Sequence, residues 1–282
     1  MGNQGLKDAT EPERQWATAI PAALQRRPTF RARHAPAMRA IISIMGGLLL
    51  WEFVGRFIVT DPIFFVPFTS VIAALGKLAT SGNLAHHLSI SGTEYAGGFG
   101  LAIAVGVPFG ILMGASRKLH DYVDPWVSAL YATPLVALTP FFILVFGIGV
   151  ESKIALVFTI AVFPALINTA AGVRAIDPSY LEVASAFRLS RRQRFVKTLV
   201  PASLPFIVSG LRLSAGRGLI GVVVGELFFA SGGVGFVISV SAQTFDTATL
   251  LAGVLIFSVA GVSAFAILRA LERKLSPWRQ GL

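Results

Sequence analysis

The 282-residue sequence contains no cysteine, which excludes disulfide bonds, thiol catalysis and cysteine-ligated metal sites. Its four histidines do not form a metal-binding set with nearby acidic residues, so we predict no metal site. The long apolar runs also lack a cluster of paired aspartates, or of histidine with glutamate, that could act in catalysis. These absences argue against an enzyme. The histidines are His34, His86, His87 and His120.

Charge is scarce as well. Only 13% of the residues are charged and 54% are hydrophobic, with a mean hydropathy of +0.72. Soluble domains carry about 25% charged residues. The net charge of +10 suggests nucleic-acid binding at first, but lysine and arginine stand in short blocks between long apolar runs. That pattern is typical of the loops of a membrane protein. We therefore predict a lipid bilayer as the surroundings and no nucleic-acid partner.

A nucleotide-binding loop of the form G-x-x-x-x-G-K-[ST] is also missing. The glycine-rich stretch 231–235 is followed by no Lys-Ser or Lys-Thr, and it is predicted to be an outer turn. Residues 1–38 are polar and arginine-rich, so we expect no cleavable signal before the first span. The chain itself is thus predicted to bind no cofactor.

The apolar runs predict an all-α polytopic membrane protein of about six transmembrane helices, since about 20 apolar residues cross a bilayer. A polar tail is expected over residues 1–38, a transmembrane domain over 39–275 and a second tail over 276–282. Residues 71–78 are predicted to form an amphipathic helix outside the spans. The predicted spans are 41–59, 95–113, 127–146, 154–171, 206–229 and 250–271.

Basic residues orient these spans. With this topology, 19 of the 24 lysines and arginines fall in the tails and in the two loops on the same side of the membrane. Three fall on the opposite side, and Arg212 and Arg217 lie near the start of the fifth span. Basic loops are retained in the cytoplasm. Both termini are therefore predicted to be cytoplasmic.

Small and polar residues inside the spans suggest two kinds of contact. Gly106, Gly110 and Gly114 repeat every four residues and predict a close helix–helix contact. Polar residues at membrane depth either line a pathway or make hydrogen bonds between helices, and both interpretations stay open for each residue. The pathway candidates are Tyr131, Thr133, Thr139, Asn168 and Glu226.

Glu226 is the ionisable residue of greatest interest in these runs, because a charge within a span is costly and needs a partner or water. One hypothesis places Glu226 on a substrate or gating route. The other pairs it with Arg217 or with a helix end just outside the fifth span.

The loop over residues 174–205 is predicted to be ordered. Asp177-Pro178-Ser179 has the composition of a helix start, with a capping residue followed by proline. A basic amphipathic stretch then runs over 191–199, before Pro201 and Pro205. A short exposed helix of this kind suits a groove in another protein, or alternatively the surface of an anionic membrane.

The segment 182–188 resembles the cytoplasmic "EAA" loop of binding-protein-dependent ABC importer permeases. That pattern reads Glu-Ala-Ala, three residues, Gly, nine residues, Ile, one residue and Leu-Pro. Glu182, Ala184 and Pro201 match it, while Arg188 stands in place of the glycine. From about residue 88 to 274 the chain is similar to the nitrate/sulfonate/taurine branch, where Glu94 replaces an expected basic residue. The loop residues are Asp177, Glu182, Val183, Ala184, Ser185, Ala186, Phe187, Arg188 and Pro201.

The resemblance implies the fold of a type I ABC importer permease in the bacterial inner membrane, working as a homodimer. Two copies of a separate ATPase subunit would carry ATP and Mg, and a periplasmic binding protein would deliver a small anionic substrate. The loop helix would sit in a cleft of the ATPase, with Glu182 facing basic groups and Ala184 allowing close approach. An ion-gradient-driven secondary transporter is the alternative, which would need paired acids or broken helices at the midplane.

Overall fold

The computed structural model describes residues 30–228 and 231–275, and it divides into two units, Met1–Val54 and Gly55–Leu282. In the first unit, helix α3 (Phe30–Phe53) leads into a π-helical turn at Val54–Ile58. The described part of the chain contains helices and no strand, which confirms the predicted all-α fold. The helices of the second unit are α4 (Phe68–Thr80), α5 (Asn83–Ala115), α6 (Arg117–Ala132), α7 (Thr139–Phe146), α8 (Val150–Arg174), α9 (Pro178–Ala186), α10 (Arg191–Arg194), α11 (Val200–Leu227), α12 (Val234–Gln243) and α13 (Thr247–Leu275).

Five helices in the described residues are long and apolar enough to cross a membrane, and a bent pair of shorter helices can make a sixth span. Many large apolar side chains on them remain exposed, among them Leu112 (54%), Val262 (70%) and Ile267 (67%). Such surfaces are stable in lipid, where apolar side chains need no cover. The five long helices cover Met38–Ile58, Asn83–Ala115, Val150–Arg174, Arg192–Leu227 and Thr247–Lys274.

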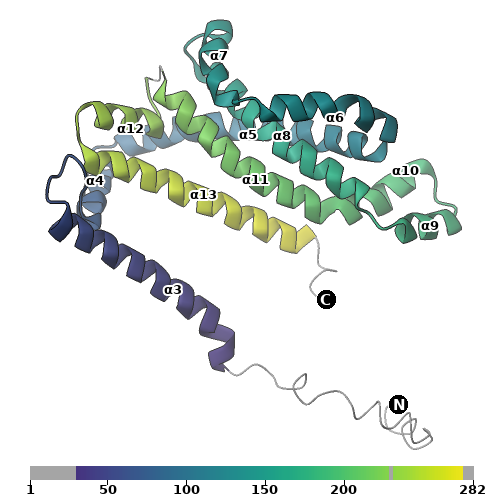
Figure 1. Ribbon diagram of the computed structural model, residues 1–282, viewed down its shortest axis with the longest axis horizontal. Coiled ribbons are helices and arrows are strands. Elements are labelled where there is room, and N and C mark those ends of the chain that lie inside the picture. Colours follow the sequence, from purple (N-terminus) through teal and green to yellow (C-terminus); the bar gives the residue numbers. More distant parts are fainter. Residues whose placement is uncertain (1–29, 229–230, 276–282) are drawn as a thin grey trace, which may run out of the picture. The chain divides into compact units, whose positions relative to one another are not determined.

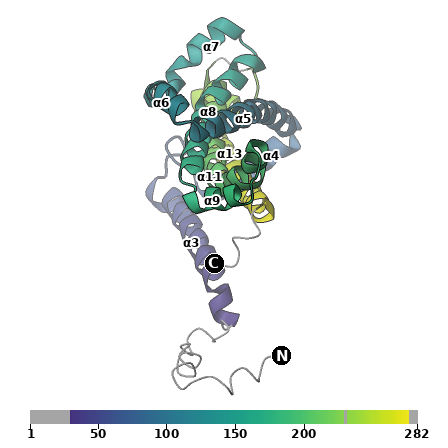
Figure 2. The ribbon, with the colours of Figure 1, turned by 90° about the vertical axis from the view of Figure 1, so that its right-hand side faces the viewer.

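The third predicted span, residues 127–146, is not one straight helix. Helix α6 stops at Ala132, a 3-10 turn follows at Leu135–Leu138, and the axis bends by 80° before α7. The cause lies in Thr133-Pro134, because a residue that precedes proline is pushed out of the helical region and proline donates no hydrogen bond. Thr133 accordingly has φ −69° and ψ 139°. Figures 1 and 2 show α7 projecting from the other helices of its unit.

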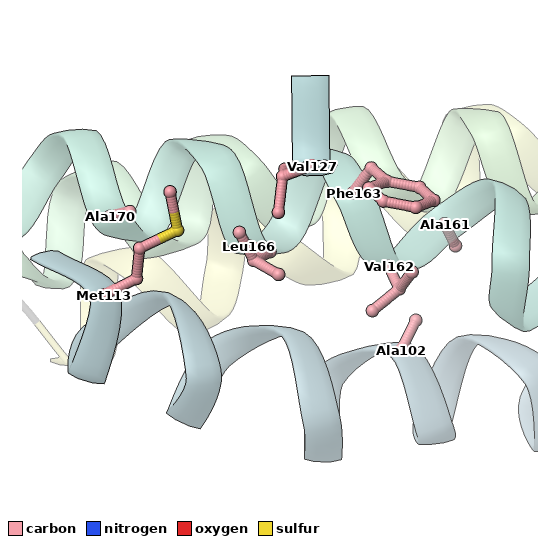
Figure 3. Packing of buried hydrophobic residues seen from close by; sticks show 8 residues of the cluster. All are labelled: Ala102, Met113, Val127, Ala161, Val162, Phe163, Leu166 and Ala170. Carbon is pink, nitrogen blue, oxygen red and sulfur yellow. The ribbon is translucent and has the colours of Figure 1, made fainter. Parts of the chain in front are cut away.

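The centre of the second unit is α8, which packs against α5 on one side and α11 on another, while α11 also packs against α13 (Figure 1). A buried apolar cluster fills the space between α5, α6 and α8. In Figure 3, Val162 of α8 points toward Ala102 of α5, and Val127 reaches the cluster from α6. A second buried cluster packs α11 against α8, with Leu211 and Ala215 of α11 and Ala165 of α8 among its members. The two clusters fix the positions of α8 and α11, which carry most of the polar residues considered below.

The predicted glycine stripe lies along the contact of α5 with α8. A Cβ atom added to Gly106 would lie 2.9 Å from the carbonyl oxygen of Val162, and one added to Gly110 would lie 2.6 Å from that of Leu166. At Gly114 the added atom would meet Val173 at 2.6 Å. Only glycine permits this approach of two helix backbones.

Candidate functional site

The loop between the spans α8 and α11 begins with the short helix α9, and its first turn is capped by Asp177. The backbone N–H of Ser179 donates to Asp177 Oδ1 at 2.8 Å, and Pro178 occupies the first helical position. This hydrogen bond to the charged form lowers the pKa of the exposed Asp177 carboxyl. Asp-Pro-Ser therefore starts the helix, as the sequence predicts.

The end of α9 is closed by two backbone hydrogen bonds around Arg188. The N–H of Arg188 donates to Ser185 O at 2.9 Å, and that of Leu189 donates to Ala184 O at 3.1 Å. This is the Schellman arrangement, which requires a left-handed residue and usually takes glycine. Arg188 adopts φ 50° here. The turn that the resemblance assigns to glycine is thus present, although an arginine forms it.

A second cap joins α9 to the next span. The N–H of Ser190 donates to Gln193 Oε1 at 2.9 Å, and the N–H of Gln193 donates to Ser190 Oγ at 3.3 Å. This reciprocal pair is a capping box. From α10 the helix continues through a π-helical turn at Phe195–Leu199 into α11, where Pro201 lies in the first turn. The capped turn after α9 therefore leads directly into a long, nearly continuous helical segment.

One face of α9 is apolar and exposed. Tyr180, Val183 and Phe187 have exposed fractions of 58%, 56% and 75%. Their i, i+3, i+7 spacing places them on one side of the helix, which is the pattern of anchors for a groove in a partner protein. Glu182 is exposed as well, on another side of the same helix. No described part of the chain covers this face.

Ala184 behaves differently from its neighbours in the loop. Its exposed fraction is 3%, whereas the next two residues, Ser185 and Ala186, are exposed. Helix α9 contacts the π-helical turn Phe195–Leu199 of the same chain. Ala184 is therefore buried within the chain, and the close approach of an ATPase that the resemblance implies for it stays a prediction.

At the far end of α11, Glu226 is buried and holds the beginning of α12. Its exposed fraction is 1%. Ser91 Oγ donates to Glu226 Oε1 at 2.6 Å, and the N–H of Gly235 donates to Glu226 Oε2 at 2.6 Å. The N–H of Val234 in turn donates to Ser91 Oγ at 2.9 Å. A carboxylate at the first turn of a helix satisfies amides that the helix leaves unpaired.

These contacts bear on the two hypotheses for Glu226. Its partner is the end of a helix just outside the fifth span, as one of them proposes. Arg217 is not its partner, because it lies nine residues earlier on α11 and is exposed. Glycine is needed around the carboxylate: an added Cβ at Gly235 would lie 2.7 Å from Glu226 Cβ. The glycine-rich stretch 231–235 is thus a bend that ends in α12, a helix that the sequence analysis did not predict.

A second buried acid, Glu94 of α5, lies beside this cluster. Lys153 Nζ of α8 is 3.0 Å from Glu94 Oε1, and the exposed fractions of the two residues are 9% and 0%. Glu94 follows Ser91 by three residues on α5, so this ion pair lies one helical turn from the hydrogen bond of Ser91 to Glu226. We define the acidic cluster as Ser91, Glu94, Lys153 and Glu226. It joins three spans and the start of α12.

The sequence did not predict that Glu94 and Lys153 are partners. Lys153 is one of the three basic residues on the side opposite to the tails, and Glu94 replaces a basic residue of the family pattern. The pair joins residues 59 positions apart on different helices. The available signal was Glu94 itself, because an acid twelve residues before Gly106 in an apolar helix needs a countercharge.

The other pathway candidates are not brought together. Thr139 is buried (3%), donates to Val136 O at 2.6 Å and lines a small pocket with Lys153 and Gly225. Tyr131 and Thr133 lie near the break after α6, where Thr133 Oγ1 donates to Ala129 O at 3.0 Å. Asn168 donates to Pro164 O at 2.9 Å within α8. Of these four, Thr139 alone lines a pocket with a member of the acidic cluster.

Residues 106–277 match the family of binding-protein-dependent transport system inner membrane components. The chain is 39% identical over 243 residues to the putative aliphatic sulfonates transport permease protein SsuC of Bacillus subtilis strain 168, which covers 83% of this chain and 88% of that protein. It is 30% identical over 236 residues to the taurine transport system permease protein TauC of Escherichia coli K12, with coverage of 82% and 86%.

Among solved structures, the chain is similar to one of the inward-facing structures of the MetNI methionine ABC transporter. The TM-score is 0.57 at 18% identity, over 68% of this chain and 97% of the other. At this identity the likeness concerns the fold, and it agrees with a type I importer permease.

Proposed function

This chain belongs to the family of binding-protein-dependent transport system inner membrane components, and on that premise we propose that it couples a separate ATPase to anion import. Two copies of the chain would enclose the route, and two ATPase subunits carrying ATP and Mg would dock on them. A periplasmic binding protein would deliver the substrate. Relatives named for aliphatic sulfonates and taurine support a small sulfonate-like or nitrate-like anion as that substrate.

The observation that carries this proposal is the uncovered apolar face of α9. Three apolar side chains at helical spacing are exposed on a helix whose two ends are both capped. A rigid helix loses little conformational entropy on binding, so its anchors favour a docking surface over a loose loop. The exposed Glu182 would contact basic groups on the rim of the ATPase cleft.

Movement of α9 would reach the spans directly. The loop joins the end of α8 at Arg174, and α10 continues into α11. Their opposite ends carry Lys153 and Glu226, two members of the acidic cluster. ATP binding would stabilise one of two arrangements of these helices, because an effector shifts an equilibrium only through its different affinity for the two states.

The acidic cluster would then act as the closure at the outer end. Glu226 and Ser91 hold the start of α12 to α5 and α11. Opening this end requires these hydrogen bonds to be exchanged for water or for a bound partner. The segments 60–93, 147–152 and 231–246 would face the binding protein.

We place both termini and α9 in the cytoplasm. Arg174, Arg192 and Arg194 flank α9, and Arg269, Arg273 and Lys274 lie near the end of α13. Basic residues on one side of a membrane protein indicate its cytoplasmic side.

The test uses the transporter purified with its ATPase and compares Phe187→Asp with the parent chain. A charge in the centre of an apolar anchor face should abolish co-purification of the ATPase, or lower substrate-stimulated ATP hydrolysis at least tenfold. The control is Phe64→Asp, an equally exposed aromatic (76%) in the turn next to Ile63, whose carbonyl oxygen accepts from Thr247 at the start of α13. This control should retain the ATPase.

Loss of ATPase co-purification in both variants would point to misfolding, and the milder Val183→Ser would then decide between the two causes. Co-purification is the readout for this control, because residue 64 lies in the segment 60–93 that would face the binding protein. Unchanged coupling in Phe187→Asp would contradict the proposal. Uptake that follows an ion gradient without ATP would support the secondary-transporter alternative.

A further inference from the structure

An arginine lies within the membrane span α11 without a countercharge. Arg217 is exposed, and within residues 38–228 and 231–275 no acidic side chain forms an ion pair with it. Arg212, five residues earlier, contrasts with it, because Arg212 pairs with Glu272 of α13. A charge in a span faces a partner or water and not hydrocarbon. The partner or the water that Arg217 faces therefore lies outside the part of the chain that the structure describes.

The position of Arg217 along α11, and that of its neighbour Val157 along α8, show how deep Arg217 lies in the membrane span. It is seventeen residues after the start of α11 and ten before its end, or about 25 and 15 Å along the axis. A Cβ added to the adjacent Gly218 would lie 3.6 Å from Val157 Cγ1. Val157 is about 25 Å from Arg174 and about 10 Å from Val150 along α8. Arg217 is thus well inside the span on both helices.

Arg217 stands on an otherwise apolar face. Phe206, Leu213 and Ile220 share this side of α11, with exposed fractions of 44%, 46% and 48%. Both borders of this face are covered, since Gly216 faces Phe265 of α13, and Gly221, one turn after Arg217, faces Val157 of α8. We call Phe206, Leu213, Arg217 and Ile220 the Arg217 face.

A second polar group borders this face. Gly210 precedes Arg217 by seven residues, which is two helical turns, so both lie on the same side of α11. A Cβ added to Gly210 would lie 2.7 Å from Asn168 Cβ of α8. A side-chain amide therefore stands at the edge of the Arg217 face, two turns away from the guanidinium.

We propose that the Arg217 faces of two copies meet across the molecular two-fold axis and that the two guanidinium groups bind an oxyanion between them. This inference rests on the proposed function, because it requires the homodimer. Symmetry places the same residue on both sides of an axial contact, so two Arg217 side chains approach each other. Like charges repel unless an anion bridges them, and a planar guanidinium binds sulfonate, nitrate or carboxylate oxygens in pairs. The route therefore selects for anions through this chain, in addition to any selection by the binding protein.

The absence of cysteine allows a direct test with single thiols. Ile220→Cys is placed in the full transporter with its ATPase, in phosphatidylcholine nanodiscs. Its reaction with the anionic reagent 2-sulfonatoethyl methanethiosulfonate is compared with that of the cationic 2-trimethylammonioethyl analogue, each relative to a free thiol. The anionic reagent should react about tenfold faster than the cationic one, since a nearby unit charge changes local concentrations by this order. Adding Arg217→Gln should remove the preference.

A matched control is available on α13. Gly261 contacts Leu219, so Val262 lies at about the level of Ile220 and is 70% exposed. Val262→Cys should show no anion preference. Oxidation of Ile220→Cys with copper phenanthroline should also join two copies of the chain, whereas Val262→Cys should not.

Equal rates for the two reagents, or a preference that survives Arg217→Gln, would overturn the anion site. Loss of the preference for the anionic reagent when phosphatidylglycerol is added to the discs would also overturn the anion site, because Arg217 would then bind lipid headgroups. Protection of Ile220→Cys by free ethanesulfonate would support the site. If Phe187→Asp uncouples the ATPase while Ile220→Cys shows no preference, the proposed function stands and the Arg217 site is wrong. Failure of the parent chain to assemble with the ATPase would count against the proposed function itself.

Discussion

The two ends of the α8–α11 pair are built in opposite ways. At one end, α9 satisfies its own backbone through caps and leaves apolar side chains exposed. At the other end, the acidic cluster buries two carboxyl groups and an ammonium group, which find their partners within the chain. The contrast teaches that exposure of apolar groups and burial of charge are both departures from an ordinary fold. The first supports the proposed docking of an ATPase, and the second is the basis for the proposed closure at the outer end.

The largest effect is expected at the closed end, in Lys153→Met. It leaves Glu94 buried without its countercharge, and breaking one side of a buried ion pair costs about 3–5 kcal/mol. We expect a marked fall in the unfolding midpoint of the purified chain, measured by scanning fluorimetry. Glu94→Gln combined with Lys153→Met should recover at least half of the loss. The exposed Lys77→Met is the control, and an equal loss there would mean that the ion pair is unimportant.

The second largest effect is expected from Glu226→Ala. Two buried donors, Ser91 Oγ–H and the Gly235 N–H, would lose their acceptor at a cost of about 2–3 kcal/mol. Hydrogen exchange of the first turn of α12 should become faster, while exchange in α9 should not change. Glu226→Gln keeps one acceptor and should have a smaller effect. Equal exchange in α12 for all three chains would show that Glu226 does not hold this helix.

A smaller effect on stability is expected at Gly110, where α5 packs closely against α8. Gly110→Leu would force a side chain against the backbone of α8 and destabilise the chain by about 1–3 kcal/mol. Gly100 lies on the same helix with open space at its Cβ position, so Gly100→Leu should be tolerated. Thermal unfolding of the two variants in parallel measures the difference. The same loss in both would contradict the close α5–α8 packing.

The smallest effect is a gain in stability, in Arg188→Gly. Glycine adopts the left-handed conformation without the cost of about 1 kcal/mol that other residues carry. Hydrogen exchange of α9 should slow slightly. Arg192→Gly, in the helical segment α10, should act in the opposite direction because glycine weakens a helix interior. Slower exchange in both variants would rule out this explanation.

Much of the fold follows from local sequence, whereas the acidic cluster does not. Long apolar runs mark the spans because the bilayer sets their length, and Asp177-Pro178 marks the start of α9 through a local cap. Thr133-Pro134 indicates a helix end at the 80° bend, but the apolar residues on both sides of it predict one continuous span. The Glu94–Lys153 pair depends on the packing of α5 against α8, which no local pattern specifies.

The central claim is that the exposed face of α9 docks into the ATPase. The most direct measurement is cross-linking of Val183→Cys, in this otherwise cysteine-free chain, to single cysteines lining the cleft of the ATPase. We predict a cross-link at Val183 and none at Ala184→Cys, because Ala184 is buried within the chain. A cross-link at neither position, in a complex that still couples ATP hydrolysis to uptake, would contradict this account.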